Sequence, residues 1–328
     1  MYGANKKMLN LLILRVLQEH SDADHRLTQG EIIRLLQLQY GITCDRRSVR
    51  SNIQSLQDMG YDIATHGGYW LVERDFDDAE LRMLIDSVLF SKNLSGVQAK
   101  RLIEKLKGFG NRYFHAKVDH VSNLPEMFHS DNKQVMVVLD TLNDAIEEKK
   151  KVSFIYNCYG TDFKLHPRRD EPYIVNPYHM VANNGRYYLI GNYDKYDDLS
   201  HYRIDRITSV TMLSEQVKPK KDVREFAGGW SLPKHMAEHI YMYSGDSVTV
   251  KFIADTDLMD ELIDWFGRDF HIKKESENKM LVTLRCNERA MKYWALQYGG
   301  HIEIKEPQSL RETVKATVLD MAKKYGGE

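Results

Sequence analysis

The hydrophobic positions of the N-terminal part of the chain repeat with the period of an α-helix. A first helix is predicted over 5–20, because its aliphatic side chains recur at intervals of three and four residues. A second helix begins at Thr28, where Glu31 completes a capping box, and a third runs from a Thr43 cap over 43–60. Helices joined by such a short turn are typical of a helix-turn-helix.

The pattern then changes twice before the middle of the chain. The stretch YDIATHGGYWLVE, residues 61–73, carries apolar residues on both sides of Gly67 and Gly68, which predicts a β-hairpin. Directly after a helix-turn-helix, such a hairpin would be a wing. Helical periodicity returns over 77–114 and again over 132–151.

From residue 152 onwards the pattern is typical of strands. Short segments rich in Tyr, Val, Ile and Phe alternate with turn residues over 152–213, which predicts a small, strongly bent β-sheet or barrel. After a loop at 216–222, strands and helices are expected in a βαββαβ order, which is typical of a ferredoxin-like module. The sequence therefore predicts a multidomain α+β protein.

These changes of pattern suggest four parts. We expect a winged helix-turn-helix DNA-binding domain over 1–75, a helical linker over 76–150, a β-barrel domain over 151–216 and an α+β extension over 217–328.

Size and composition are consistent with this division. At 328 residues and 38.3 kDa the chain is too long for one typical core. Its net charge of −1 means that affinity for nucleic acid has to come from a local basic face. The cysteines, only 3 in number and widely separated, suggest a reducing compartment. With neither a signal peptide nor an apolar run of roughly 18 residues, a cytoplasmic location is expected.

The third helix carries residues of the kind that read DNA. Arg47, Ser51 and Gln54 lie opposite its apolar stripe, with Arg50 at the edge, and arginine and glutamine form paired hydrogen bonds with guanine and adenine. We predict DNA contacts by Arg46, Arg47, Ser48, Arg50, Ser51 and Gln54, and by His66 at the wing tip. The alternatives are that these helices belong to a larger bundle and that His66 is merely solvated.

The adjacent tyrosines in NNGRYYLIGNY, residues 183–193, need an explanation. Successive side chains of a strand point to opposite sides, so Tyr187 and Leu189 are expected in the core and Tyr188 on the other face. In LSHYRIDRI, residues 199–207, the same alternation places His201 and Arg203 together on a polar face.

These two stretches carry a family resemblance. NPYHMVANNGRYYLIGNY followed by HYRIDRI resembles the WYL domain, with Tyr187-Tyr188-Leu189 as its triplet and 202–206 as its FRxDR motif. Tyrosine replaces Trp in the first motif and Phe in the second. YWALQYGG and EPQSLRE resemble the family's C-terminal extension.

The resemblance implies a transcription factor with a winged helix-turn-helix, a helical linker, an Sm-like or SH3-like barrel and the extension. It also implies a homodimer whose barrel senses a ligand, a nucleic acid or nucleotide. An aromatic plane beside arginine forks suits a base next to a phosphate. The predicted ligand-binding residues are Tyr178, His179, Tyr188, His201, Arg203 and Arg206.

A purely structural interpretation of the same residues stays open, in which Arg203 pairs with Asp205 within the sheet and Arg206 caps the turn. The leading functional hypothesis is a DNA-binding regulator with an anionic effector. The alternative is an accessory protein that binds RNA or another single-stranded nucleic acid.

Signs of other chemistry are weak. His235 and His239 are spaced to hold a metal, but Met236 stands where zinc hydrolases of the H-E-x-x-H kind have Glu. A constellation of nucleophile, base and oxyanion donors is not found. We therefore expect no enzyme, no cofactor and no metal.

Overall fold

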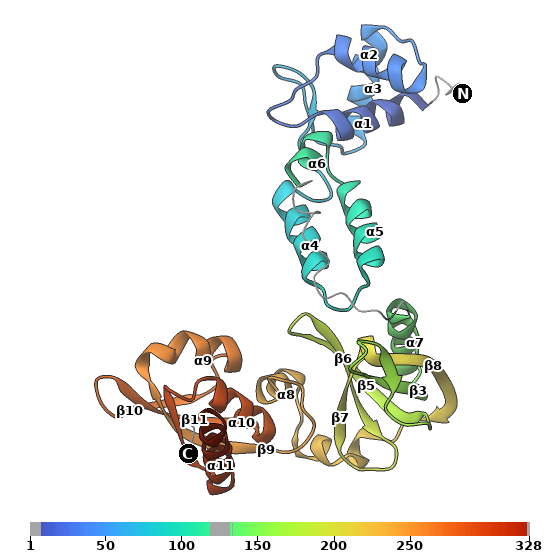
Figure 1. The fold of residues 1–328 in the computed structure, drawn as a ribbon. Helices are drawn as coiled ribbons and strands as arrows, with labels where there is room; N and C mark the ends of the chain where they lie inside the picture. Colours follow the sequence, from blue (N-terminus) through green and yellow to red (C-terminus); the bar gives the residue numbers. More distant parts are fainter. Residues whose placement is uncertain (1–7, 119–131, 133, 327–328) are drawn as a thin grey trace. The chain divides into compact units, whose positions relative to one another are not determined.

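The computed structural model describes residues 8–118, 132 and 134–326. They divide into two compact units, 1–131 and 132–328, and each unit is considered by itself (Figure 1). The four-part division of the sequence remains a prediction.

The first unit begins with three helices and a small antiparallel hairpin, the arrangement of a winged helix-turn-helix. The elements are α1 (Leu9–His20), α2 (Gln29–Tyr40), α3 (Arg46–Asp58), β1 (Ile63–Ala64) and β2 (Trp70–Leu71). Their apolar faces meet in one core that includes Ile13, Ile32 and Val49. The predicted capping box is present, because Thr28 accepts from the Glu31 N–H and the Glu31 carboxylate accepts from the Thr28 N–H.

The start of the third helix differs from the prediction. Asp45, and not Thr43, caps α3, and its Oδ1 accepts the Ser48 N–H at 2.7 Å. Asp45 stands two residues after Thr43, and a carboxylate at the positive end of the helix is the stronger acceptor.

The linker region is helical but interrupted. It forms α4 (Asp78–Phe90), α5 (Gly96–Lys107) and α6 (Arg112–Val118). A capping box made by Ser95 and Gln98 starts α5 and explains the break within the expected 77–114. Leu81, Ile103 and Phe114 pack between these helices.

Two side chains hold the C-terminal end of α1, Arg74 from the segment before α4 and Asn111 from the linker just before α6. The Arg74 guanidinium donates to the carbonyls of Gln18 and Ser21 at 2.8 and 2.6 Å. The Asn111 amide donates to Ser21 O at 3.2 Å. The carbonyls at the C-terminal end of α1 thereby find partners.

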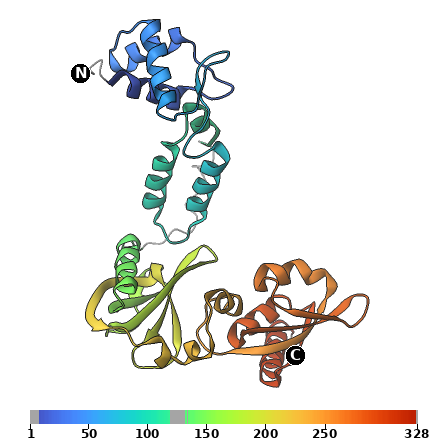
Figure 2. The ribbon, with the colours of Figure 1, turned by 180° about the vertical axis from the view of Figure 1, so that it is seen from behind.

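The second unit starts with a helix packed on a curled half-barrel of strands (Figures 1 and 2). Strand order is β4-β3-β5-β6-β7, and β8 pairs with the other edge of the bent β3. The elements are α7 (Val135–Glu147), β3 (Lys150–Tyr159), β4 (Leu165–Pro167), β5 (Tyr173–Asn183), β6 (Arg186–Tyr193), β7 (Leu199–Arg203), the 3-10 turn η2 (Ile204–Arg206) and β8 (Ile207–Gln216). Val138, Phe154 and Leu189 lie in the core between helix and strands.

A connector follows and leads into the C-terminal module. It consists of the 3-10 turns η3 (Lys220–Asp222) and η4 (Arg224–Gly228) and helix α8 (Leu232–Glu238). Its apolar side chains cover the outer side of β5 to β7, where Tyr178, Ile190 and Val223 are buried together. The sheet of the half-barrel therefore carries apolar contacts on both faces.

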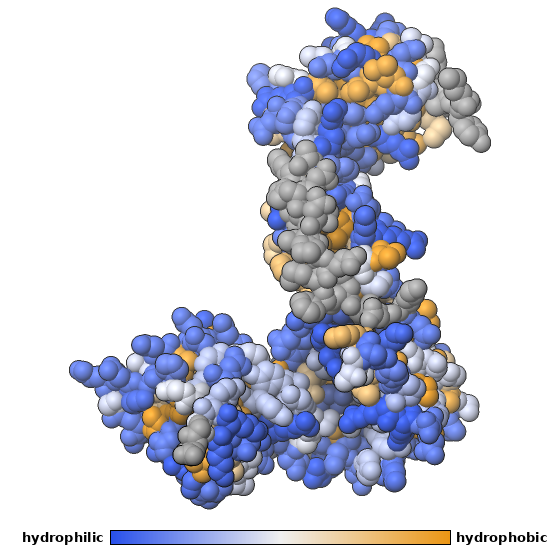
Figure 3. Space-filling model, viewed as in Figure 1, coloured by the Kyte–Doolittle hydropathy of each residue, from blue (hydrophilic) through white to orange (hydrophobic). Residues whose placement is uncertain are grey.

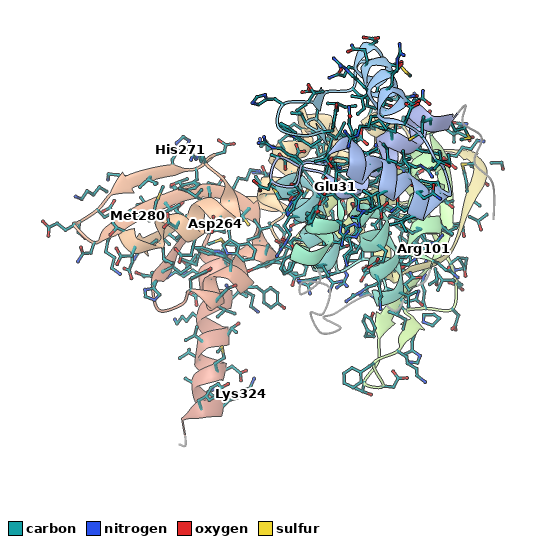
Figure 4. All side chains as sticks on the ribbon, turned by 90° about the horizontal axis from the view of Figure 1, so that it is seen from above. Glu31, Arg101, Asp264, His271, Met280 and Lys324 are labelled. Atoms are coloured by element: carbon teal, nitrogen blue, oxygen red, sulfur yellow. The ribbon has the colours of Figure 1, made fainter. Side chains whose placement is uncertain are left out.

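The C-terminal module has the predicted ferredoxin-like order. Strands pair antiparallel in the order β10-β11-β9-β12, and helices follow the first and third of them in the chain. The elements are β9 (Ser247–Asp255), η5 (Thr256–Leu258), α9 (Met259–Phe266), β10 (His271–Lys274), β11 (Lys279–Asn287), α10 (Glu288–Gln297), β12 (Ile302–Glu306) and α11 (Gln308–Tyr325). In the core, Trp294 meets Phe252 at a tilt and Phe266 edge-on. Figure 4 shows α11 projecting from this module, with Lys324 near its end.

The visible surface is mostly hydrophilic, with scattered apolar patches (Figure 3). In the described part of the chain, no helix combines the length and the apolar character needed to cross a membrane.

Gly191 allows β5 and β6 to approach each other at a bulge in β5 between Pro177 and His179. A Cβ at Gly191 would lie 2.7 Å from Val175 Cγ1 and 2.8 Å from the backbone oxygen of Asn176. Real Cβ atoms do not come this close to a backbone atom, so a side chain here would force the strands apart.

We therefore predict that Gly191→Ala lowers the free energy of unfolding by about 1–3 kcal/mol, as overpacking does elsewhere. Urea denaturation followed by circular dichroism measures it. Gly300→Ala is the control, because nothing lies within 4 Å of the added Cβ. Equal stability of the two variants would contradict this account of the bulge.

Candidate nucleic-acid interface and anion site

The outer face of α3 carries the predicted DNA-contacting side chains. Val49, Ile53 and Leu56 are buried on its inner face. The exposed residues are Arg46, Arg47, Arg50, Ser51 and Gln54. The Gln54 amide donates to Asp58 Oδ1 at 3.0 Å, which holds that amide along the exposed face. Ser48 is half-buried, and its N–H is taken by the Asp45 cap.

Arg26 places a positive charge against the wing, and the sequence patterns did not reveal this contact. His66 is exposed at the tip, and its carbonyl accepts from Arg26 Nη1 at 3.4 Å. The Arg26 guanidinium also lies 4.4 Å from the ring centre of Trp70. The contacts of Arg26 span 40 residues, so local periodicity gave no signal for them.

A buried carboxylate organises the far end of the half-barrel. Only 1% of Asp205 is exposed. Arg203 donates to it from Nε at 3.0 Å and from Nη2 at 2.6 Å, and Arg186 donates from Nη1 at 2.9 Å. The predicted pairing of Arg203 with Asp205 is therefore present, as a two-pronged ion pair.

A third arginine completes what we call the arginine set: Arg186, Arg203 and Arg206. Arg203 ends β7, whereas Arg206 ends the turn η2. The alternation of side chains along a strand therefore does not hold between these two arginines. Both are close enough to Tyr188 for their charges to affect its ionisation. The Nε–H of Arg206 is buried and meets no acceptor among the residues that the structure describes. Asp205 is therefore paired with two guanidinium groups, and the third, that of Arg206, keeps a buried donor without an acceptor among the described residues.

Two tyrosines stand beside the arginine set. Tyr156 Oη accepts the backbone N–H of Arg203 at 3.1 Å, and burial raises the pKa of this phenol. Tyr188 is half-buried, and burial likewise raises its pKa although the charges of Arg203 and Arg186 oppose the shift. Both rings are therefore neutral near pH 7, and the charge of the site resides in the arginines and Asp205.

The expectation that Tyr187 packs into the core is wrong. Tyr187 is 39% exposed, whereas Leu189 is fully buried. The reason is position along the strand, because Tyr187 follows the Asn184-Gly185 turn and pairs with the exposed Ala182. Alternation gives the direction of a side chain, but only the neighbouring strands decide how far the core extends.

The structure places the remaining candidates against the connector. Tyr178 donates to Lys218 O at 2.7 Å and packs edge-on to Phe226. His179 stacks on Trp230 with ring centres 4.9 Å apart. His201 lies 2.8 Å from His235 between their Nε2 atoms. Tyr178, His179 and His201 therefore have partners in the connector, whereas Tyr188, Arg203 and Arg206 lie close enough for the arginine charges to act on the tyrosine.

Arg186 is the site residue that sequence reasoning missed. It precedes Tyr188 by two residues, so alternation puts both side chains on one face of β6. Opposite them in register, Tyr188 pairs with Arg203. The same parity argument that selected Tyr188 would have selected Arg186.

A metal centre is not apparent. The residues that the structure describes contain no group of three or more His, Cys, Asp or Glu side chains able to hold an ion.

Comparison with known proteins identifies two domains. Residues 137–212 match the WYL domain, and residues 246–322 match the WCX domain. The chain is 23% identical over 199 residues to YobV of Bacillus subtilis (strain 168), described as an uncharacterised HTH-type transcriptional regulator. That match covers 60% of this chain and 58% of YobV, so the chain spans little more than half of this relative.

Two solved structures are similar at low identity. Proteasome accessory factor B/C of Arthrobacter aurescens is 16% identical to this chain, with a TM-score of 0.31. The match covers 95% of this chain and 48% of the chain of that protein. A CRISPR Cas-related protein is 14% identical, covers 97% of this chain and 84% of its own, and has a TM-score of 0.41.

We predict that Asp205→Asn destabilises the second unit by about 3–5 kcal/mol, because it leaves the buried ends of Arg186 and Arg203 without their counter-charge. Urea titration of the full chain measures the loss. Asp197→Asn is the control, since Asp197 is 78% exposed in its pair with Lys218 and exposed pairs contribute under about 1 kcal/mol. A loss for Asp205→Asn no larger than that of the control would contradict a structural role for the carboxylate.

Proposed function

Since the chain contains a WYL domain followed by a WCX domain, we propose that it is a DNA-binding transcriptional regulator whose half-barrel binds an anionic effector. The effector is a nucleotide or a short single-stranded nucleic acid. The arginine set carries this proposal, because two of its guanidinium groups share one carboxylate and the Arg206 Nε–H has no acceptor among the described residues.

DNA binding is supported by the exposed side chains of α3. Arginines and a glutamine lie along one face of a helix whose other face is buried, as recognition requires. The exposed His66 at the wing tip and the nearby Arg26 suit contacts to phosphates, which position a protein without reading sequence.

One winged helix reads only a short site. We therefore propose a homodimer that contacts two half-sites. We also propose that the protein acts in the cytoplasm and is not an enzyme.

Effector binding follows from the chemistry of the arginine set. A phosphate oxygen at Arg206 would give its buried Nε–H an acceptor, and guanidinium groups bind phosphate through paired hydrogen bonds. The half-buried Tyr188 offers a ring on which a base can stack.

For the effector to act as a switch, it has to bind the DNA-competent and DNA-incompetent states with different affinity. An accessory protein that binds RNA would use the same arginines, but it would not require the DNA-contacting side chains on the exposed face of α3. DNA binding by α3 therefore separates the two functions.

We predict that Arg47→Ala and Gln54→Ala each reduce discrimination between operator and unrelated DNA by about 1–3 kcal/mol, because each removes a paired contact to a base. Gel-shift titrations with the upstream DNA, unrelated duplex and single-stranded RNA measure it, and their stoichiometry tests for two chains per operator. Arg101→Ala on α5 is the control, because it removes the same charge from an exposed helix outside the winged helix. Unchanged discrimination in the double variant, or preference for RNA, would contradict the proposal.

We predict that Arg206→Gln abolishes the effect of effector on operator affinity, while operator affinity without effector stays unchanged. The variant removes the donor that phosphate would engage, but leaves the Asp205 ion pairs in place. Operator titrations with and without a panel of nucleotides and short oligonucleotides measure it. Arg268→Gln is the control, because Arg268 is exposed outside the half-barrel. A folded Arg206→Gln protein with a full response would contradict the effector site.

A further inference from the structure

Three histidines gather between the half-barrel and the connector, away from the arginine set. His201 belongs to β7, His235 to α8, and His239 follows α8 directly. Their ring centres lie 5.0 Å apart for His201 and His235, 5.1 Å for His201 and His239, and 4.1 Å for the stacked pair His235 and His239. We call these three residues the histidine cluster.

Hydrogen bonds fix where the protons of this cluster lie. The indole N–H of Trp230 can only donate, and it points at Nδ1 of His235 at 3.1 Å. Nδ1 therefore carries a lone pair, and the proton of neutral His235 is on Nε2. That N–H donates to Nε2 of His201 at 2.8 Å, so the proton of neutral His201 is on Nδ1. The result is a chain of neutral donors and acceptors from Trp230 to His201.

Among the described residues, the remaining ring nitrogens of the cluster meet a carbonyl or no acceptor. Nδ1 of His239 donates to the His235 carbonyl at 2.9 Å, and its Nε2 faces the Gly245 carbonyl at 3.4 Å. Nδ1 of His201 is buried and has no acceptor among the described residues. Burial, and then the neighbouring histidines, lower the pKa of His235 to about 3 and that of His201 well below 6.5.

The surrounding elements carry both cationic and acidic side chains, of which Glu225 keeps one oxygen without a hydrogen-bond partner among the described residues. From η3, Lys220 lies 3.1 Å from Nε2 of His179, which itself belongs to β5. Glu238 of α8 is paired with Arg285 of β11 at 3.3 Å. Glu225 of η4 accepts the Leu199 N–H through one oxygen, and its other oxygen is buried. In the part of the chain described, the hydrogen bonds of the three rings involve no carboxylate.

We propose that the histidine cluster and Trp230 form a proton-sensitive latch that fastens the connector, residues 217–246, to the half-barrel. A second proton on His235 would occupy Nδ1 and face the Trp230 N–H. A second proton on His201 would occupy Nε2 and face the His235 N–H. Either proton turns an attractive contact into two opposed donors and places a charge in a buried, already basic setting.

Opening the latch would release α8 from β7 but leave other contacts between these segments. The backbone N–H of His201 donates to Ser244 Oγ at 3.2 Å, and Asn184 donates to the Ile240 carbonyl at 3.4 Å. Because the connector runs directly into β9, the latch would set how firmly the WCX domain is tied to the WYL domain. This inference does not depend on the proposed DNA or effector binding.

The direction of the pH effect follows from linkage. Both histidines have lower pKa values in the closed latch than the ordinary value of about 6.5, so the closed state binds fewer protons. Closure is therefore complete above about pH 6.5 and weakens as the pH falls below it. When the pH falls from 7.5 to 5.5, the equilibrium constant for opening rises about tenfold for each histidine and about a hundredfold for both together.

Hydrogen exchange of the full-length protein tests the latch. After correction for intrinsic exchange, we expect protection of the α8 amides to fall about ten- to a hundredfold from pH 7.5 to 5.5, with little change in α10. His235→Gln supplies an amide oxygen for Trp230 and an amide N–H for His201 but does not titrate, so most of the fall should disappear. His271→Gln, which alters an exposed histidine of β10, should behave as wild type.

Unchanged protection of α8 in wild type would overturn the proposal, as would a full decrease that persists in His235→Gln. If that variant fails to fold, the protonation of the histidine ring nitrogens in the wild-type protein tests the proposal instead. Histidine-detected ¹⁵N correlation spectra at pH 7.5 should show His235 protonated at Nε2 and His201 at Nδ1. The opposite tautomers, or a doubly protonated ring, would overturn it.

Discussion

The half-barrel depends on one buried carboxylate. Asp205 receives hydrogen bonds from Arg203 at the end of β7 and from Arg186 on β6, and its backbone carbonyl accepts from the Asn132 side chain just before α7. Removing a charge from water is tolerated only where such partners are supplied. The carboxylate therefore fixes the end of β7, the start of β8 and the approach of α7 to one another.

The need to neutralise the buried carboxylate of Asp205 also explains why positive charge gathers at this site. Two arginines are needed to hold Asp205, and this leaves the region with more positive than negative charge once Arg206 is counted. Arg206 follows directly in the turn, and the Asn157 amide holds its carbonyl at 2.9 Å. A structural ion pair and an anion site are thus not competing interpretations. The first orients two of the guanidinium groups from which the proposed anion site would be built.

The sequence predicted the elements more reliably than their contacts. The capping box at Thr28 and the βαββαβ order follow from local spacing, and both are present. Tyr187 was misplaced because alternation alone does not tell where a core ends. His201 was grouped correctly by parity with Arg203, but its partner His235 lies 34 residues away on the connector. Contacts of that kind depend on how segments pack, and no local period encodes them.

The most direct test of the account is the salt dependence of binding of a short single-stranded oligothymidylate to the full-length protein. Each neutralised phosphate should contribute about −0.7 to the slope of log K against log salt. If two or three arginines engage phosphates, the slope should lie between roughly −1.4 and −2.1, and Arg206→Gln should make it shallower by about 0.7. No measurable binding, or a slope that Arg206→Gln leaves unchanged, would contradict the claim that the arginine set is an anion site.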